Sequence, residues 1–365
     1  MAAELKRTPL EDEHRALGAK LGPFAGWLMP IQYEGTLAEH RAVREAVGLF
    51  DLMHLGKVIV EGGDAFDVLQ RTVTNDLAKV PVGRAQYNTV LNERGGIIDD
   101  LIVYRLGKER YFVVPNAANT AKVHGILRQA AGDEARVELH EDWCFLAVQG
   151  PRSVEVVSRA VAAARDLGYL RCTEAEFSGH RLILTRSGYT GEWGFELFPE
   201  ISGVRELWRS LLDAGRDQGI RPVGLGARDT LRLEMGYPLH GQDISEEHTP
   251  LEAGLSWAVA LDKGPFPGRD ALVRQKEEGI RSRLWGLKMR DRVIPRPHCA
   301  VFAGTERAGE TTSGTFSPTL RIGIALAYLE PRDRFSEGDE VEVDVRGRRG
   351  AAVITKPPFV DASPR

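Results

Sequence analysis

An order of strands and helices that occurs twice between residues 58 and 214 most constrains what this chain can fold into. Apolar residues three or four apart predict helices, and alternating ones between turn residues predict strands. The first run holds strands 58–60, 86–91, 97–106 and 111–114 with helices 64–71 and 119–129. The second holds strands 145–148, 182–185 and 194–198 with helices 152–164 and 204–214. This repeat of topology, without a matching residue pattern, predicts an α+β fold of two packed split βαβ, ferredoxin-like lobes.

A further helix is predicted before the first run, over residues 36–47, with Gly48 as its stop. Four apolar or aromatic side chains are expected on one packing face of this helix: Leu37, His40, Val43 and Val47.

The last part of the chain has a different pattern. The Pro/Gly-rich segment 263–268 indicates a boundary. Short strands are predicted beyond it, at 284–289, 322–328, 341–345 and 352–354, and they favour a small β barrel or sandwich. Since a domain usually holds about 100 to 200 residues, we expect a region 1–265 of two lobes, about 1–140 and 141–265. Residues 266–280 then connect it to a C-terminal β unit, 281–365.

Charge and composition argue against several classes of protein. The formal net charge is −4 with both signs interspersed, so we expect no nucleic-acid partner. No apolar run approaches the roughly 18 residues of a membrane span, and the first residues lack an apolar leader segment. We therefore expect a cytoplasmic protein that does not associate with a membrane. The cysteines and histidines lack metal-ligand spacing, so we expect reduced thiols and no metal.

Asp100 is the first candidate for chemistry. Side chains alternate along a strand, so Asp100 shares a face with Ile102 and Tyr104 while Asp99 points the other way. The two acids are therefore not expected to form a catalytic dyad. A carboxylate on an apolar, aromatic face either lies at the mouth of a strand or binds a partner. Asp99 is expected to be solvated or to satisfy the turn at residues 95–96.

Two glycine-containing segments leave alternatives open. The run 188–194 has glycines every three residues, which suits either close ligand approach or a plain hairpin. The segment 224–229 opens a helix without a convincing strand before it and lacks the third glycine of a dinucleotide motif. On that helix Arg228 and Arg232 form a like-charge pair, for which Asp229 or Glu234 is the expected acid.

Seven motifs across residues 8–360 together resemble the T-protein family of the glycine cleavage system. They are Phe50-Asp51 with His54, Thr74-Asn75-Asp76, the segment 95–102, the segment 188–192, the segment 227–234, the segment 312–318 and the segment 356–360. The resemblance implies two folate-binding lobes followed by an antiparallel β barrel. It also implies a tetrahydrofolate-dependent aminomethyltransferase that takes an aminomethyl group from the lipoyl arm of H-protein and acts as a monomer.

The same resemblance implies roles for individual residues. Asp100 is expected to be the catalytic acid beside the reacting folate nitrogens, and Asp99 its less critical neighbour. Glu196 is expected to accept the two adjacent N–H groups of the pterin edge, because a carboxylate accepts such a pair in bidentate fashion. Further folate-binding positions are expected at Arg228, Asn116, Tyr87, Tyr104, Met53 and Tyr189.

One departure and two rival functions remain. Leu52-Met53 replaces the Val-Ser more common before the family's histidine, so no catalytic role is expected for His54. A related demethylase would keep the fold and the folate but take another substrate. A non-catalytic folate-binding relative carries a cysteine motif that Cys144, Cys172 and Cys299 do not reproduce.

Overall fold

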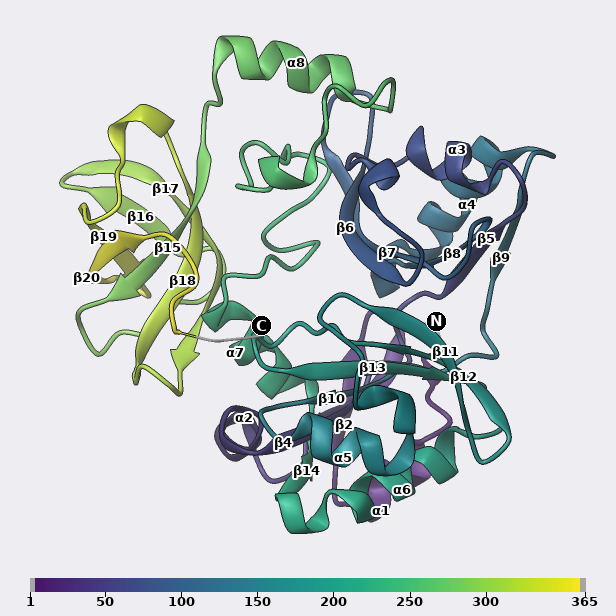
Figure 1. Cartoon of the computed structure of the whole chain (residues 1–365). Coiled ribbons are helices and arrows are strands. Elements are labelled where there is room, and N and C mark those ends of the chain that lie inside the picture. The colour runs from purple at the N-terminus through teal and green to yellow at the C-terminus, as the bar shows by residue number, and fades with distance from the viewer. Residues whose placement is uncertain (1–3, 362–365) are drawn as a thin grey trace.

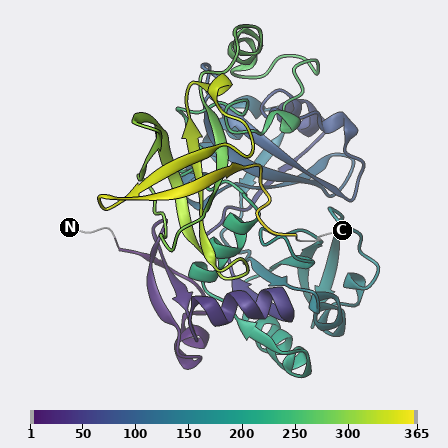
Figure 2. The same ribbon diagram turned by 90° about the vertical axis from the view of Figure 1, so that its left-hand side faces the viewer.

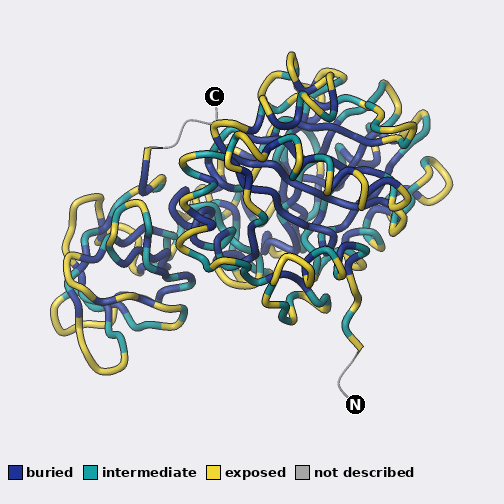
Figure 3. Tube along the Cα trace, turned by 90° about the horizontal axis from the view of Figure 1, so that it is seen from below, coloured by how far each residue is buried: buried dark blue, intermediate teal, exposed yellow. Residues whose placement is uncertain are grey.

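Three units surround the middle of the molecule in the computed structural model, which describes residues 4–361 (Figure 1). The barrel lies on the left of that view, the first lobe at the upper right and the second lobe below. The turned view brings the barrel strands to the front (Figure 2). Buried residues lie inside the units, and exposed residues gather at the outer turns of the trace (Figure 3).

The first lobe is a five-stranded antiparallel sheet in the order β6-β7-β8-β5-β9. Its strands are β5 (Val58–Glu61), β6 (Arg84–Leu91), β7 (Ile97–Arg105), β8 (Arg110–Val114) and β9 (Arg136–Leu139), and its helices are α3 (Ala65–Gln70) and α4 (Thr120–Ala131). The inward residues of β7, Leu101 and Val103, pack in its core. The predicted strands are confirmed to within two residues, and β9 was not predicted.

The second lobe is a six-stranded sheet in the order β11-β12-β13-β10-β4-β14. Its elements are β4 (Val47–Asp51), β10 (Leu146–Gln149), α5 (Ser153–Ala160), β11 (Cys172–Phe177), β12 (His180–Thr185), β13 (Gly194–Pro199), α6 (Val204–Ala214) and β14 (Ile220–Pro222). It repeats the layout of the first lobe, except that β4 is inserted between β10 and β14. The expected boundary between the lobes near residue 140 therefore does not separate the two sheets, because β4 precedes that boundary and belongs to the second sheet.

Two predicted helices end earlier than expected. α2 spans Thr36–Glu45, and Val47 already begins β4. Gly48 is therefore not a helix stop, and a Cβ there would lie 2.5 Å from Cγ2 of Val43. Leu37 is 54% exposed, so it does not share the buried face of α2. α5 ends at Ala160 because Val161 adopts extended backbone angles before a short 3-10 turn.

The N-terminal residues add a small sheet that the apolar pattern did not predict. It consists of β1 (Lys6–Arg7), β2 (Lys20–Phe24) and β3 (Trp27–Gln32), with α1 (Glu11–Ala16) between them. Thr8 and His14 from this segment both bond the buried Asp51 at the end of β4, at 2.5 Å and 2.8 Å. The segment is thereby tied to the second lobe.

The C-terminal unit is a closed six-stranded antiparallel barrel, as the family resemblance implied. Its strands are β15 (Arg283–Met289), β16 (Ala300–Ala303), β17 (Glu306–Ser317), β18 (Ile322–Leu329), β19 (Glu340–Val345) and β20 (Arg348–Thr355). The long strand β17 escaped prediction because several of its buried positions carry threonine or serine. The remaining helices are α7 (Leu225–Glu234), α8 (Arg269–Glu278) and the 3-10 turns Leu77–Lys79, Ala117–Asn119, Ala162–Ala164, Arg216–Gln218, Ser256–Ala258 and Arg332–Arg334.

Helix α7 lies between the second lobe and the barrel (Figure 1). The short strand β14 precedes it after all, and Gly224 caps its start. At its far end Glu234 accepts hydrogen bonds from Ser317, the last residue of β17, at 2.5 Å and from Thr319 beyond that strand at 2.9 Å. Within residues 4–361 no helix is long and apolar enough to cross a bilayer.

Candidate active site

Asp100 lies on β7 and is held by two uncharged donors. The Tyr87 hydroxyl on the neighbouring strand β6 donates to Oδ2 at 2.9 Å, and Asn116 Nδ2 donates to Oδ1 at 2.8 Å. Burial raises the pKa of the Asp100 carboxyl above its ordinary value, and the bond from Tyr87 works against that rise. The residue as a whole is half-buried.

Asp99 differs from the prediction. It is 0% exposed, and it accepts bonds from Asn116 N at 3.0 Å, Asn116 Nδ2 at 2.9 Å and Asn119 Nδ2 at 2.6 Å. The turn at residues 95–96 is satisfied by Asn92 instead. Burial raises the pKa of Asp99 to about 7, and the charge of Asp100 adds to the rise. Although the two acids alternate along β7, the Asn116 amide joins them into one aspartate pair.

Glu196 is linked to the same strand through Tyr104. The Tyr104 hydroxyl, on the face of β7 that carries Asp100, donates to Glu196 Oε2 at 2.9 Å. Ser187 Oγ donates to the same oxygen at 2.6 Å. Within residues 4–361, Glu196 Oε1 accepts no hydrogen bond, although the residue is only 8% exposed. Oε1 keeps some contact with solvent, and a carboxylate oxygen without a protein donor is suited to a ligand that supplies one.

Arg228 and Tyr189 form the third part of the site. The Arg228 guanidinium lies 4.7 Å from the centre of the Tyr189 ring, and Tyr189 stacks on Tyr237. Burial lowers the pKa of Arg228, and burial together with the charge of Asp100 raises that of Tyr189. No carboxylate of the described chain forms an ion pair with Arg228, so its N–H donors are available to a ligand acceptor.

The neighbouring Arg232 has a different environment. Its side chain pairs with Asp229 at 2.7 Å and with the buried Asp243 at 2.6 Å. Glu234 instead binds Arg44 at 2.9 Å. Of the two acids proposed from spacing, Asp229 therefore serves Arg232, and neither one lies between Arg228 and Arg232.

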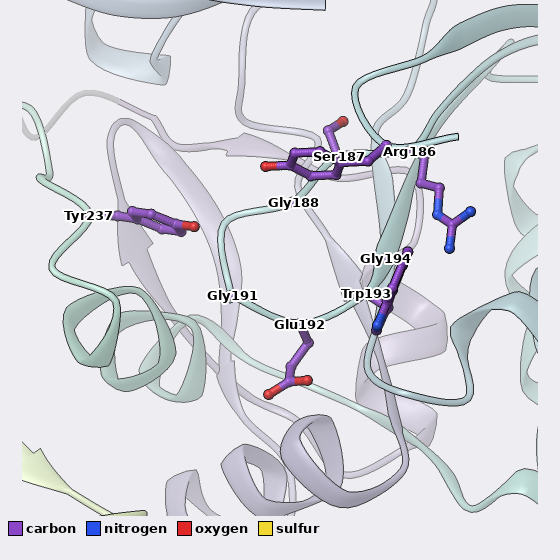
Figure 4. Close-up of a pocket in the computed structure, with 9 residues that line it drawn as sticks. Arg186, Ser187, Gly188, Gly191, Glu192, Trp193, Gly194 and Tyr237 are labelled. Atoms are coloured by element: carbon purple, nitrogen blue, oxygen red, sulfur yellow. The ribbon is translucent and has the colours of Figure 1, made fainter. Parts of the chain in front are cut away.

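The glycine-rich run joins β12 to β13 as a hairpin and also surrounds a small hollow (Figure 4). The hollow has room for about 10 Å³, the size of a single water, and is lined by Arg186, Glu192, Trp193 and Tyr237 among others. A Cβ at Gly191 would lie 2.2 Å from Met235 Sδ, so the turn requires glycine there. The hollow is too small for a folate, and the candidate site is the group of residues around Asp100, Glu196 and Arg228.

Two models of protein families match the chain. The model of the GCVT N-terminal domain matches residues 10–263, and that of the glycine cleavage T-protein C-terminal barrel domain matches residues 282–361. The chain belongs to the glycine cleavage T-protein family. It is an aminomethyltransferase, an enzyme of the transferase class.

Relatives of similar length support the assignment to the T-protein family. An aminomethyltransferase of Parafrankia sp. is 50% identical over 99% of this chain and 100% of its own length. One from Mycobacterium tuberculosis is 47% identical over 99% of both. The crystal structure of glycine cleavage system aminomethyltransferase T from Bartonella henselae is 38% identical, covers 98% of both chains and superimposes with a TM-score of 0.91.

Several of the T-protein motifs form contacts between the units of this chain. Thr74 bonds the carbonyl of Ala258 at 2.9 Å and so holds the segment after the second lobe against the first. Ser313, from the segment 312–318, bonds Arg232 at 2.8 Å and Asp243 at 2.9 Å. These motifs join the three units, whereas the segments 95–102, 188–192 and the start of α7 carry site residues.

Met53 and His54 lie just after strand β4. Met53 is 5% exposed and packs in the core of the second lobe, where its sulfur lies 3.7 Å from Lys57 Nζ. Its side chain contributes to this core, and its folate-binding role stays a prediction. His54 packs edge-on against Phe24. Burial lowers the pKa of His54 to about 3, and the positive charge of Arg228 contributes, so the ring is neutral near pH 7.

Asn119 and His240 take part in the site but were not predicted. Asn119 stands one helical turn after Asn116, and that spacing was the signal for a second donor on the same side. His240 belongs to a distant segment, so no local pattern pointed to it. Among residues 4–361, no three histidine, cysteine or acidic side chains cluster as a metal site.

Proposed function

We propose that tetrahydrofolate binds across the group formed by Asp100, Glu196 and Arg228, and that it accepts a one-carbon unit from the lipoyl arm of H-protein. The observation that carries this proposal is the Tyr104 hydroxyl, which ties Glu196 to the face of β7 that bears Asp100. A bound molecule that reaches Glu196 thus lies close to Asp100 as well.

The pterin edge suits Glu196. It presents a ring N–H beside an exocyclic amino group, and the free Oε1 together with Oε2 can accept both. Arg228, which has no acidic partner among the described residues, suits the pterin carbonyl or a carboxylate of the folate tail. Tyr87 and Tyr189 supply aromatic surface next to these groups, and Asn116 orients Asp100.

The reaction exchanges two bonds at one carbon. The carbon of the aminomethyl group loses its bonds to the lipoyl sulfur and to nitrogen and gains bonds to two folate nitrogens. The two folate N–H hydrogens end on sulfur and on ammonia, so the products are dihydrolipoyl H-protein, ammonia and 5,10-methylenetetrahydrofolate. Asp100 orients the amine, carries a proton between these atoms and stabilises the positive charge that develops as ammonia leaves.

The proposal also covers the location, the oligomeric state and the division of the chain into domains. The chain acts in the cytoplasm as a monomer, with residues 1–265 as the folate-binding region, 266–280 as a connection and 281–365 as the barrel. H-protein docks so that its lipoyl arm reaches Asp100. Light scattering on the purified protein measures the oligomeric state.

The decisive experiment mixes the purified protein with aminomethylated H-protein and tetrahydrofolate and measures ammonia and methylenetetrahydrofolate. We expect both products in equal amounts. Folate binding without either product would favour a binding module. Turnover of an N-methylated amine in place of H-protein would favour the demethylase.

A further inference from the structure

Asn119 is placed between Asp99 and a histidine from another part of the chain. Its Nδ2 lies 2.6 Å from Asp99 Oδ1 and 3.0 Å from His240 Nδ1. The other ring nitrogen, Nε2, lies 3.0 Å from the carbonyl oxygen of Ile97, the first residue of β7. A carbonyl only accepts, so Nε2 carries the hydrogen and, in the neutral ring, Nδ1 accepts from Asn119. His240 thus anchors Asn119 to the start of the strand that bears both acids.

Donors are scarce around the aspartate pair. The Asn116 amide has two hydrogens but faces three acceptors: Asp99 Oδ1 at 2.9 Å, Asp100 Oδ1 at 2.8 Å and the Asp100 carbonyl at 2.9 Å. Asn119 relieves this shortage, because it donates to Asp99 Oδ1, the same oxygen that the Asn116 amide faces. While Asn119 is in place, the Asn116 hydrogens are available to Asp100.

We propose that His240 is a positioning residue for Asp100, acting through Asn119 and Asn116. Its Nδ1 holds the Asn119 amide on Asp99, which leaves Asn116 to hold Asp100 in its reactive orientation and to stabilise its ionised form. The inference rests on the proposed function, in which Asp100 is the group that reacts. It assigns His240 a part in the protonation of Asp100 without contact to the substrate.

Loss of His240 is expected to raise the pKa of Asp100. Without its anchor Asn119 leaves Asp99, the Asn116 amide turns toward Asp99, and the Asp100 carboxylate loses a donor. Since hydrogen bonds to a carboxylate favour its ionised form, Asp100 then takes up its proton at higher pH. The charged groups that face His240 are Asp99 and Asp100 on β7, and Glu246 on its own segment, which pairs with Lys122 of α4.

The test compares His240→Ala with His240→Gln. Glutamine can donate to Ile97 O and accept from Asn119 without an imidazole. We expect His240→Ala to lower kcat about 3- to 10-fold with little change in KM for tetrahydrofolate, and to move the acid limb of the kcat profile up by about half to one pH unit. His240→Gln should restore most of kcat and return the acid limb of the profile close to its wild-type position. The matched control is His248→Gln. His248 lies in the same segment as His240, but its ring stacks on Tyr328 of β18 and does not contact Asn119.

A second readout does not depend on turnover. In protein labelled with ¹³C at aspartate carboxyls, the Asp100 signal is assigned from its absence in Asp100→Asn and titrated without substrates. His240→Ala should shift this titration upward, and an unshifted titration would overturn the inference. If His240→Ala does not fold, Asn119→Ala takes its place with the same expectation. A wild-type protein that makes no methylenetetrahydrofolate would defeat the proposed function, while the titration would still decide the role of His240.

Discussion

Among the individual residues, Asp100 is distinguished by the donors that hold it. Tyr87 and Asn116 are uncharged, and no Lys, Arg or His of the described chain forms an ion pair with Asp100. An adjacent cation would strongly favour the ionised carboxylate. Here burial keeps the pKa of Asp100 raised, which suits a group that has to take up and release a proton during a reaction.

Replacing Asp100 by Asn keeps the shape of the side chain but removes its proton chemistry. We expect turnover in the H-protein assay to fall by roughly 10² to 10⁴, the usual range for an acid-base group. The free energy of unfolding in urea should change little, because the Asn oxygen can accept from Asn116 while its NH2 donates to the Tyr87 hydroxyl oxygen. Near-normal turnover would remove Asp100 from the reaction.

Replacing Glu196 by Gln removes the negative charge that is proposed to hold the pterin edge. We expect folate affinity, measured by calorimetry, to fall by about 1 to 3 kcal/mol as a charge-assisted hydrogen bond is lost. Glu200→Gln is the control, because Glu200 pairs with Arg181 at the protein surface. Equal affinity in wild type and Glu196→Gln would place the pterin elsewhere.

Among the elements, β4 and α7 decide how the second lobe is assembled. Strand β4 comes from the first 51 residues and lies between β10 and β14. The second sheet is therefore complete only when this distant segment pairs with both strands. Helix α7 then presents Arg228 to the site while Arg232 and Glu234 bind the barrel side. Side chains four apart on one helix thereby serve a site and an interface.

The close packing of β4 leads to a prediction about Gly48. A Cβ there would lie 2.5 Å from Val43 Cγ2 and 2.6 Å from Val223 Cγ2, so Gly48→Ala should overpack the lobe. We expect the free energy of unfolding to fall by about 1 to 3 kcal/mol. The control is Gly125→Ala in α4, where a Cβ meets nothing within 4 Å. That change should stabilise the helix by roughly 0.5 to 1 kcal/mol, so equal effects in denaturant would contradict the packing argument.

In the whole molecule, two buried polar clusters join the barrel to the lobes. In one, Arg232 bonds Asp243 and Ser313. In the other, Glu234 accepts from Arg44, Ser317 and Thr319. The barrel is therefore held by directional contacts in addition to the apolar contacts of Leu233 with Ile324 and Phe359.

Arg232→Ala leaves the Asp243 carboxylate buried without its cation. We expect the free energy of unfolding to fall by about 3 to 5 kcal/mol, with the barrel separating from the lobes at lower urea concentration. Arg216→Ala is the matched control, because Arg216 pairs with Asp213 at side-chain exposures of 82% and 69%. Its loss should cost less than about 1 kcal/mol. A single transition at the wild-type midpoint would show that Arg232 does not hold the units together.

The Glu234 cluster predicts how acid affects the assembly. Burial opposes ionisation, but the bonds from His40, Ser317 and Arg44 lower the pKa of Glu234 from 4.5 to about 2. Because the folded pKa is the lower one, ionised Glu234 contributes stability above about pH 4.5, and this contribution is lost as the pH falls toward 2. Glu234→Gln should therefore flatten the pH dependence of unfolding in that window. An unchanged slope would mean that Glu234 titrates alike in both states.

Much of the fold was predictable because it depends on local spacing. The strands and helices of the first lobe follow the apolar period of their own residues, and strand alternation separated the faces of Asp99 and Asp100. Strand β17 was missed because its inward threonine and serine residues are satisfied by distant partners, as at Ser313 and Ser317.

The sequence was enough to predict most strands and helices of both lobes, though not β4, β9, β11 or β14, together with the family and the strand that carries Asp100. These follow from residue periods and from motifs that are read along the chain. Three contacts became visible only in the folded chain: Asn116 joins the aspartate pair, Tyr104 ties Glu196 to β7, and His240 anchors Asn119. Such contacts join residues separated by up to 121 positions. Since hydrogen-bond donors are shared between acceptors in space, no local spacing records which acceptor receives them.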